Sequence, residues 1–419
     1  MKQDLNRRQF LQASGALALS SSALGKLRLS APKPPAGKTM VVLFLRGGAD
    51  NLNMLVPYKD KDYHQARPTI AIQEDDGLVP LDDGFALHPG LAPLAPYYES
   101  KQFAPVLNVG SPHFTRSHFD AQDFMERAAP GLRNITSGWL NRYLAHTASA
   151  DASEFRALAM QNLLPRSLRG DYPVLAVPSG LDRRRSGALD RFDEFYGEGE
   201  MAGEPSSAGQ ADSMEPQAET DEVVYSGQKT IQTLRRFQKI IAQGKNRVKD
   251  GTYPSSSFGR ALSALGKVIH AGEGLEIAAV DYHGWDHHAN QGGIQGRHTE
   301  MVTDYGQAVA AFCRDLGPRL NDVLILTMTE FGRTVRENGN TGTDHGRGGA
   351  MFLIGGGVRG GQIHGNWKGL KESILADGRD LPVLTDFRDV FSASLKQLFD
   401  FRAPKGFFPQ YKPKKLRLW

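Results

Sequence analysis

Imidazole and carboxylate side chains are concentrated in one short stretch of the chain, from Val280 to Gln291. Its sequence, Val-Asp-Tyr-His-Gly-Trp-Asp-His-His-Ala-Asn-Gln, places two carboxylates and three imidazoles directly after an apolar run. Histidine nitrogens and carboxylate oxygens are ligands for divalent metal ions. The stretch therefore predicts a metal site, and a polar loop that satisfies its own hydrogen bonds is the alternative.

Two later segments carry the same kinds of ligand. Glu330 closes the apolar run that begins at Leu324, and Asp344 and His345 lie in a glycine-rich turn. Each has a structural alternative, since Glu330 can form a salt bridge with Arg333 and an Asp-His-Gly turn can simply close a loop. Together with the first stretch, three loops offer oxygen and nitrogen ligands.

The adjacent histidines His287 and His288 are expected to point in different directions. One of them can bind a metal ion while the other contacts substrate or a ligand residue. The sequence leaves open which of the two does so.

Polar residues at two further turns could bind substrate. Ser117 precedes a helical pattern and is either a helix N-cap or a hydroxyl at a helix N-terminus, where anions are favoured. Its neighbours Arg116 and His118 either hold substrate or bond to the loop backbone. Asp50 and Asn51 follow two glycines after the first apolar run, where functional side chains often lie and where an Asx turn is the alternative.

Short apolar runs alternate with helical patterns along the chain, which predicts a mostly parallel sheet covered by helices on both faces. In such sheets ligands bind at the carboxyl ends of the strands, which is where the histidines and carboxylates fall. The expected strands cover 40–45, 104–109, 172–177, 275–281, 323–328 and 350–354, and the expected helices cover 91–98, 119–128, 138–146, 225–243 and 301–316.

The N-terminus and one internal segment differ from this pattern. Asn6-Arg-Arg-Gln-Phe-Leu11 and the mildly apolar stretch after it predict a twin-arginine signal peptide over 1–25, and hence a periplasmic or extracellular protein. We expect a linker over 26–38 and one domain over 39–419, with a flexible insertion at about 197–220. The sequence predicts no transmembrane anchor after cleavage of the signal.

Composition narrows the classes of function. The chain has 419 residues, 40% of them hydrophobic, which is ample material for a large core. Its net charge of +4 is too weak to argue for nucleic-acid binding. The single cysteine, Cys313, excludes an intrachain disulfide and a thiolate metal site.

The chain resembles the exported bacterial family called domain of unknown function 1501, within the alkaline phosphatase and sulfatase superfamily. The likeness covers roughly 39–401 and implies an alkaline phosphatase-like three-layer α/β/α sandwich. The motifs that carry it are the twin-arginine start, Arg-Gly-Gly-Ala-Asp50, Arg116-Ser-His-Phe-Asp-Ala-Gln-Asp123, Gly-Trp-Asp-His-His-Ala-Asn and Thr-Glu-Phe-Gly-Arg333.

The resemblance also implies a ligand set. In the superfamily, one metal is held by an aspartate and a histidine from one loop and by a histidine from a later turn. Here this implies Asp281 or Asp286, His287 or His288, and His345.

The second metal position of the superfamily is altered in this chain. Its members have an aspartate after the first strand and an Asp-His pair after a later strand, where this chain has Arg46 and Glu330-Phe331. The residues that could still serve at the second metal position are the implied nucleophile Ser117, Glu330 and a relocated Asp50. We hypothesise that the Arg46 guanidinium replaces the second cation and offers fixed positive charge to a tetrahedral anion.

These features predict an exported metal-dependent hydrolase or transferase of phosphate or sulfate esters, with one divalent ion. Zinc fits the ligands best, and manganese or calcium would fit if carboxylates dominate. The alternative is a catalytically degenerate member that binds an anionic ester, an envelope glycan or an exported partner protein. The expected catalytic residues are Ser117, Arg46, Arg116 and His118, the expected substrate-binding residues are Asp50, Asn51 and Arg333, and the expected metal ligands are Asp281, Asp286, His287, His288, Glu330 and His345.

Overall fold

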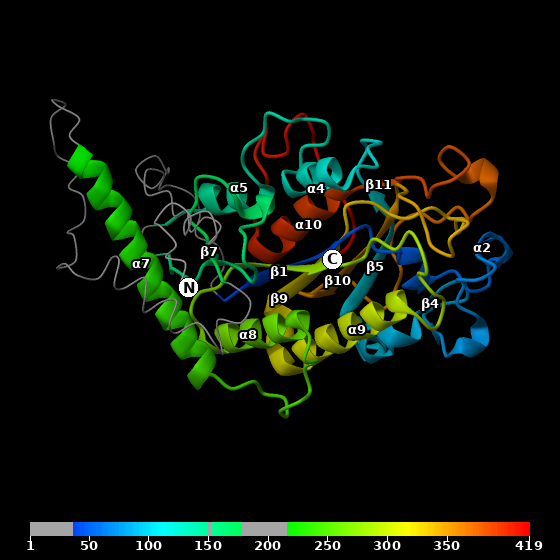
Figure 1. Cartoon of the computed structure of the whole chain (residues 1–419), viewed down its shortest axis with the longest axis horizontal. Coiled ribbons are helices and arrows are strands. Elements are labelled where there is room, and N and C mark those ends of the chain that lie inside the picture. Colours follow the sequence, from blue (N-terminus) through cyan, green and yellow to red (C-terminus); the bar gives the residue numbers. More distant parts are fainter. Residues whose placement is uncertain (1–36, 150–151, 178–215) are drawn as a thin grey trace, which may run out of the picture.

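The computed structural model of the chain describes residues 37–149, 152–177 and 216–419 (Figure 1). The predicted signal peptide, most of the linker and residues 197–215 of the expected insertion lie outside these ranges. The rest of that insertion, 216–220, forms the start of helix α7 (Pro216–Gln243).

A central sheet, with eight strands in the described part of the chain, organises the fold. Strand β10 runs antiparallel to both of its neighbours, and every other neighbouring pair is parallel, so the predicted mostly parallel sheet is confirmed. In spatial order the strands are β11 (Thr385–Asp386), β5 (Phe103–Gly110), β10 (Gly349–Gly355), β9 (Val323–Met328), β1 (Thr39–Arg46), β8 (Ile277–His283), β6 (Ala157–Ala159) and β7 (Leu175–Ala176).

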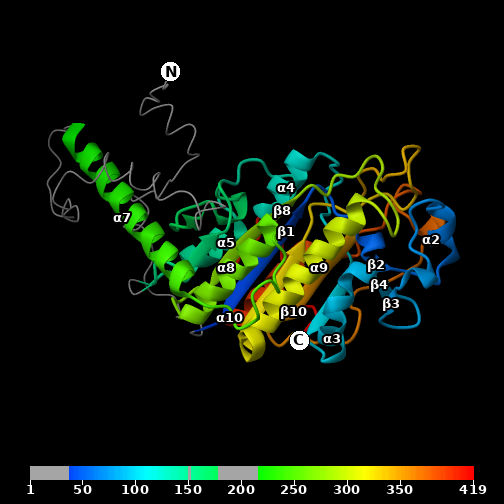
Figure 2. The same ribbon diagram turned by 60° about the horizontal axis from the view of Figure 1, so that its bottom comes forward.

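Helices cover both faces of this sheet and make three layers (Figure 1). One face is covered by α8 (Ser257–Ala271) and α9 (Arg297–Leu316), which lie in front of the strands in Figure 2. The other face is covered by α4 (His118–Glu126), α5 (Trp139–His146) and α10 (Phe387–Phe399). None of the described helices has the length and apolar character of a membrane span.

Smaller elements lie beside this sandwich. They are the helices α2 (Lys61–Ala66) and α3 (Ala95–Glu99) and an antiparallel sheet of β2 (Leu55–Val56), β4 (Ala86–Leu87) and β3 (Val79–Pro80).

Strand β1 shows how the two layers of core are built. Successive side chains of a strand point to opposite faces of its sheet. Leu43 therefore packs in the cluster that contains the α8 and α9 side chains, whereas Val42 and Phe44 pack in the cluster with those of α5 and α10. All eight residues of β1 are buried, and the six between Thr39 and Arg46 form a continuous apolar run, as expected of a central parallel strand.

The loops that carry the predicted site residues meet at one edge of the sheet. Strands β1, β5, β8 and β9 run in the same direction, so their carboxyl ends share this edge. Strand β10 is antiparallel and begins here, with Gly349 paired to Val109 near the end of β5. The loop before β10, which contains His345, therefore joins the loops that follow the other strands.

Several predicted elements differ in extent. The expected strand 172–177 is reduced to β7, and the expected helix 91–98 is a 3-10 segment (Pro89–Leu94) that continues into α3. Pro93 and Pro96 cannot donate the hydrogen bonds of a regular α-helix, which accounts for the second difference. Strand β6 and helices α8 and α10 were not predicted; β6 is too short to show a period.

Asp315 on α9 anchors the connection between α7 and α8. Its carboxylate is fully buried and accepts hydrogen bonds from Asn246 Nδ2 (2.6 Å) and from the Tyr253 hydroxyl (2.8 Å). His270 Nε2 lies 3.2 Å from the other carboxylate oxygen. Buried polar groups of this kind are stable only while their partners remain.

We expect Asp315→Ala to lower the free energy of unfolding by about 3 kcal/mol, because several buried donors lose their acceptor. Asp322→Ala removes a partly exposed pair with Lys38 and is the matched control, with an expected loss below about 1 kcal/mol. Urea denaturation followed by circular dichroism measures both. Equal losses in the two variants would contradict the anchoring role of Asp315.

Candidate metal centre

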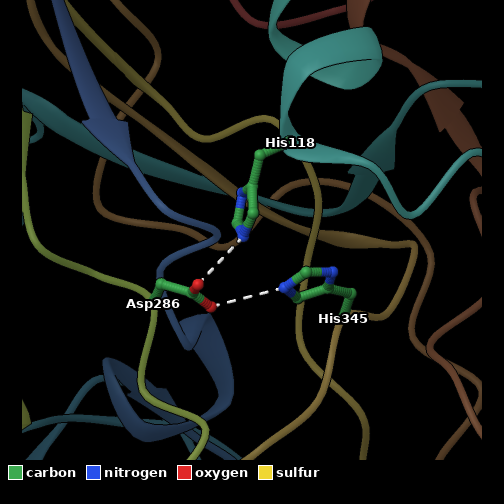
Figure 3. A group of neighbouring side chains, drawn as sticks. All are labelled: His118, Asp286 and His345. Atoms are coloured by element: carbon green, nitrogen blue, oxygen red, sulfur yellow. Dashed lines mark hydrogen bonds and ion pairs between the residues drawn. The ribbon is translucent and has the colours of Figure 1, made fainter.

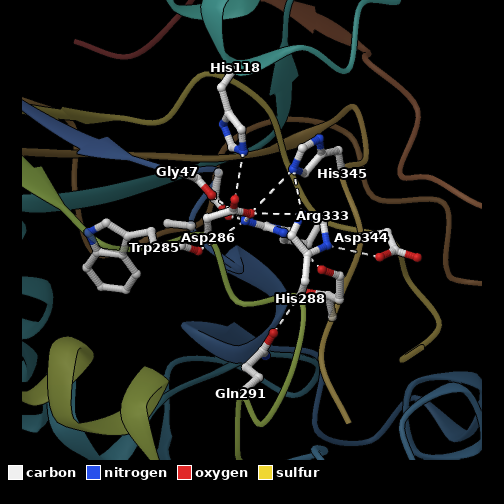
Figure 4. Close-up of polar contacts among 12 residues, drawn as sticks. Gly47, His118, Trp285, Asp286, His288, Gln291, Arg333, Asp344 and His345 are labelled. Carbon is white, nitrogen blue, oxygen red and sulfur yellow. Dashed lines mark hydrogen bonds and ion pairs between the residues drawn. The ribbon is translucent and has the colours of Figure 1, made fainter. Parts of the chain in front are cut away.

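Arg333 joins the loops that follow or precede three strands. Its buried guanidinium donates hydrogen bonds to the carbonyl oxygens of Gly48 (2.5 Å), Trp285 (3.1 Å) and Thr343 (2.9 Å), and Nη2 lies 2.6 Å from Asp286 Oδ1 (Figure 4). Gly48 lies in the loop after β1, Trp285 and Asp286 lie in the loop after β8, and Thr343 lies in the loop before β10. The sequence predicts substrate binding by Arg333, but its donors are committed to these loops and to the carboxylate.

Asp286 lies at the centre of the site. Burial alone would raise its pKa, but the hydrogen bond and charge of Arg333, together with the nearby histidines, lower the pKa to about 2. The carboxylate is therefore ionised at neutral pH. Its side chain is 43% exposed, which leaves it open to a ligand from solvent.

Three histidines direct one ring nitrogen toward Asp286. His345 Nε2 lies 3.3 Å from Oδ1 and His118 Nε2 lies 3.3 Å from Oδ2 (Figure 3). His288 Nε2 lies 3.0 Å from Oδ1 (Figure 4). One ligand atom from each of His118, Asp286 and His345 lies within 4.8 Å of the others. The Nε2 atoms of His288 and His345 are 2.8 Å apart. Three histidines and one carboxylate from three loops thus converge on one point.

Two of these rings have their other nitrogen, Nδ1, occupied by an oxygen atom that can only accept. His345 Nδ1 lies 2.6 Å from the carbonyl oxygen of Arg116, and His288 Nδ1 lies 3.0 Å from Asp344 Oδ1. Burial opposes ionisation of Asp344, but hydrogen bonds from Asn338 and His288 lower its pKa. Both Nδ1 atoms therefore carry a proton and donate it.

His118 is held in the same way by Glu330, which is fully buried. His118 Nδ1 lies 2.8 Å from Glu330 Oε1, which also accepts from Gln122 Nε2 (2.7 Å) and from the Gly47 amide (2.9 Å). Burial opposes ionisation of Glu330, but the bonds from His118 and Gln122 lower its pKa. The sequence predicts Glu330 as a metal ligand; the structure places it behind His118, as the residue that orients this ring.

Protons on three Nδ1 atoms leave lone pairs on the three Nε2 atoms when the rings are neutral. Burial lowers the pKa of His345, which favours its neutral form. Lone pairs that face one another and a carboxylate repel, unless a cation lies among them. The buried Nε2 atom of His118 has no hydrogen-bond partner among the described residues.

These residues fit a divalent metal ion. Histidines whose Nδ1 donates to a carboxylate or carbonyl oxygen are typical metal ligands. Ligand atoms around a tetrahedral zinc ion are about 3.3 Å apart. The Nε2 atoms of His288 and His345 and Oδ1 of Asp286 are separated by 2.8, 3.0 and 3.3 Å.

Arg46 and Asp281 form a separate buried ion pair. Arg46 Nε lies 2.5 Å from Asp281 Oδ2, and its two Nη atoms each lie 3.1 Å from an oxygen of Glu126. Burial opposes the charge of Arg46, but Glu126 and Asp281 raise its pKa. Two carboxylates therefore balance this guanidinium, which corrects the hypothesis that it is available to an anion. Asp281, for its part, does not reach the histidine cluster.

His287 turns away from the cluster. Its ring is buried, which lowers its pKa to about 4, and it packs against His298 with 5.7 Å between the ring centroids. Adjacent histidines point in different directions, as expected, and His288 is the one that reaches Asp286.

Asp50 and Asn51 are structural residues in this fold. Both oxygens of Asp50 accept from Arg67, at 2.6 and 3.0 Å, and both side chains of this pair are buried. Burial opposes ionisation of Asp50, but Arg67 lowers its pKa. Asn51 Oδ1 accepts from the Ala350 amide (3.0 Å). The sequence predicts substrate binding by both residues, and the structure instead uses their polar atoms within the protein.

Ser117 and Arg116 lie at the rim of the site. Ser117 is exposed at the N-cap of α4, and its hydroxyl does not cap the helix. Within the described residues no side chain bonds to this hydroxyl to activate it. Arg116 is half-buried and its Nη2 lies 2.6 Å from Asp380 Oδ2, so it is paired within the protein as well.

Sequence reasoning missed three residues that hold these groups in place, Arg67, Gln122 and Glu126, and it missed the role of a fourth. Arg67 gave no signal, because it lies 17 positions after its partner Asp50 and no sequence motif links the two residues. Gln122 and Glu126 did carry a signal. They are four residues apart, so they share one face of the helix that begins after Ser117. Asp344 was noted only as a possible ligand, and the structure makes it the partner of His288.

An α/β/α sandwich with a cluster of histidines around a carboxylate at the strand ends is the class that these observations define. The chain belongs to the family described as "Protein of unknown function (DUF1501)", whose model matches residues 37–398, so the predicted family is confirmed. No curated protein matches the chain.

Solved structures that are similar to the chain share little sequence with it. The PsFucS1 sulfatase from Pseudoalteromonas sp. is 11% identical, with 90% of this chain and 70% of that chain covered and a TM-score of 0.38. The phosphonate monoester hydrolase SpPMH from Silicibacter pomeroyi is 10% identical, with 91% and 78% covered and a TM-score of 0.39. The C-terminal periplasmic domain of EcEptC from Escherichia coli, in complex with Zn, is 10% identical, with 92% of each chain covered and a TM-score of 0.35.

Glu330→Gln should lower the pKa of His118 in the metal-free protein. Burial of His118 opposes its protonation, whereas the hydrogen bond and negative charge of Glu330 raise its pKa, so removing the charge removes the raising effect. An NMR pH titration of the imidazole signals measures this shift, with the exposed His146 on α5 as the unchanged control. An unaltered His118 titration would show that Glu330 does not control this ring.

Arg67→Met should lower the free energy of unfolding by about 3–5 kcal/mol, because it leaves the Asp50 carboxylate buried without its partner. The double variant Arg67→Met/Asp50→Leu should recover part of this loss. Arg133→Met, which breaks an exposed pair with Asp120, is the control and should cost less than about 1 kcal/mol. If the double variant were as unstable as the single one, the buried charge would not be the cause.

Proposed function

We propose that this protein is an exported metal-dependent hydrolase or transferase of phosphate or sulfate esters. The observation that supports the metal site is the convergence of three imidazoles, each with Nδ1 held by an acceptor, on the ionised carboxylate of Asp286. The ester class rests on the motifs that the chain shares with the alkaline phosphatase and sulfatase superfamily. Export rests on the twin-arginine sequence at the N-terminus.

Asp286, His288 and His345 are the residues that would hold the ion, because their ligand atoms form the tightest triangle in the site. Two imidazoles and one carboxylate suit zinc. An ion bound there would act as a Lewis acid toward an ester oxygen and attract an anionic substrate. Three ligands also leave a coordination position open, as catalytic rather than structural sites do.

His118 stands on the other side of Asp286, near Oδ2. Glu330 fixes the orientation of its ring through Nδ1, so that Nε2 faces the space beside the ligand triangle. A ring held in this way can accept or donate a proton at Nε2 when substrate is bound. We therefore assign His118 to proton transfer rather than to the ligand set.

Ser117 is the proposed nucleophile. It precedes His118 at the N-terminus of α4, where the backbone N–H groups and the helix dipole favour an anionic substrate. Attack by its hydroxyl oxygen would form a bond to phosphorus or sulfur and break the bond from that atom to the ester oxygen, which would leave as an alcohol after taking up a proton, while the proton of the hydroxyl would pass to a base.

A second candidate function is binding without turnover, of an anionic ester, an envelope glycan or an exported partner protein. Two observations favour it. The exposed Ser117 hydroxyl has no activating partner among the described residues, and the charge of Arg46 is balanced by Glu126 and Asp281.

Metal analysis of the purified protein tests the ligand assignment. We expect about one divalent ion per chain, and loss of this ion in His345→Ala and His288→Ala. His118→Ala should retain the ion, because His118 lies outside the triangle. His146→Ala, far from the site on α5, is the control. Loss of the ion in His118→Ala would make this residue a ligand and contradict its assigned role.

Activity assays on the same proteins separate the two candidate functions. If the protein is an enzyme, wild type should hydrolyse p-nitrophenyl phosphate or p-nitrophenyl sulfate, and His118→Ala and Ser117→Ala should each lose at least about 100-fold in kcat/KM while retaining metal. Thr115→Ala is the neighbouring control. Retained metal with no turnover of either ester would support the binding function instead.

A further inference from the structure

A cavity of about 550 Å³ lies beside the metal centre. Its walls come from α4, from the segment 160–169 and from α8, with the end of β8 as its floor. Because α4 and α8 lie on opposite faces of the sheet (Figure 1), the cavity spans the strand edge between them. Gln122 borders both sites, since it lines the cavity and also donates to Glu330.

The walls of the cavity combine apolar and polar side chains, and its rim exposes apolar side chains to solvent. Phe119 is 83% exposed and Leu163 is 57% exposed, and both line the cavity. Met160 and Phe258 lie deeper in the wall. Exposed apolar side chains gathered at a concave site are typical of surfaces that bind a ligand.

The cavity also carries positive charge that no carboxylate of the described residues pairs with. Arg169 donates to the carbonyl oxygen of Leu164 (2.8 Å) and Arg260 donates to that of Ser255. Neither guanidinium pairs with a carboxylate of the described chain. Arg46, by contrast, lies between the carboxylates of Glu126 and Asp281. Four arginines and two carboxylates line the cavity, so its formal charge is positive, and Arg169 and Arg260 are the arginines without a carboxylate partner among the described residues.

We propose that this cavity binds a small amphipathic anion. Its apolar body packs against Phe119, Leu163 and the inner wall, and its negative charge is balanced by Arg169 and Arg260. The binding requires neither a metal ion nor turnover, so it goes beyond the function proposed above. An uncharged apolar molecule would meet the same wall but would leave both arginines without a counter-charge, so the cavity should prefer the anion.

Two fluorescent probes of nearly the same apolar structure test this preference. 1-Anilinonaphthalene-8-sulfonate carries a sulfonate, and N-phenyl-1-naphthylamine lacks it. We expect the sulfonate probe to bind the metal-free protein at least about ten-fold more tightly than the neutral one, and dodecyl sulfate below its micellar concentration to displace it. Equal affinities, or no binding of the sulfonate probe, would overturn the proposal.

Variants locate the binding in this cavity. Arg260→Glu should weaken binding of the sulfonate probe at least about ten-fold and leave the affinity for the neutral probe unchanged. Arg314→Glu, at an exposed position on α9, is the charge-matched control and should change neither affinity. Ala261→Trp, which adds an indole to the cavity wall on α8, should reduce binding of both probes. Melting temperatures check that each variant is folded. Binding of the sulfonate probe that survives both Arg260→Glu and Ala261→Trp in folded protein would place it elsewhere and contradict the proposal.

Discussion

The candidate site depends on a single buried guanidinium. Arg333 binds carbonyl oxygens from the loops after β1 and β8 and from the loop before β10, and it places its remaining donor on Asp286. Burial of a charged group is costly unless it is paired and hydrogen-bonded, so these loops are held where Arg333 can be satisfied. Gly47 supports the same arrangement, because it has a positive φ of 120° and a Cβ atom there would lie 2.6 Å from the Asp286 amide nitrogen. Small changes at this point would displace Asp286 and the neighbouring histidines together.

The histidines are set by a second layer of acceptors rather than by their own packing. Glu330, Asp344 and the carbonyl oxygen of Arg116 each accept a hydrogen bond from one Nδ1 atom. These hydrogen bonds leave the Nε2 atom of each ring facing Asp286. A metal site requires its ligand atoms to be oriented in this way before the ion binds. The hydrogen bond from His118 Nδ1 to Glu330 thus explains why a carboxylate at the end of β9 lies near the site without facing its centre.

The sequence predicted the edge of the sheet at which the site lies, because apolar runs that end on polar residues mark the strand ends. It also predicted that His287 and His288 diverge. It could not place Asp281, since the structure continues β8 to His283 and so keeps Asp281 inside the strand, on the face that carries α4 and Glu126. Nor could it predict the Asp50 and Arg67 pair, whose partners are brought together only by the tertiary fold. Strand ends and side-chain alternation are local, whereas the pairing of buried charges depends on contacts between distant segments.

We propose that Asp286, His288 and His345 bind one divalent ion. A crystal structure of the protein grown with zinc, with anomalous diffraction recorded on either side of the zinc absorption edge, tests this most directly. We expect one anomalous peak about 2.0–2.2 Å from Asp286 Oδ1 and from the Nε2 atoms of His288 and His345. Absence of a peak at saturating zinc, or a peak at the Arg46 and Asp281 pair instead, would contradict it.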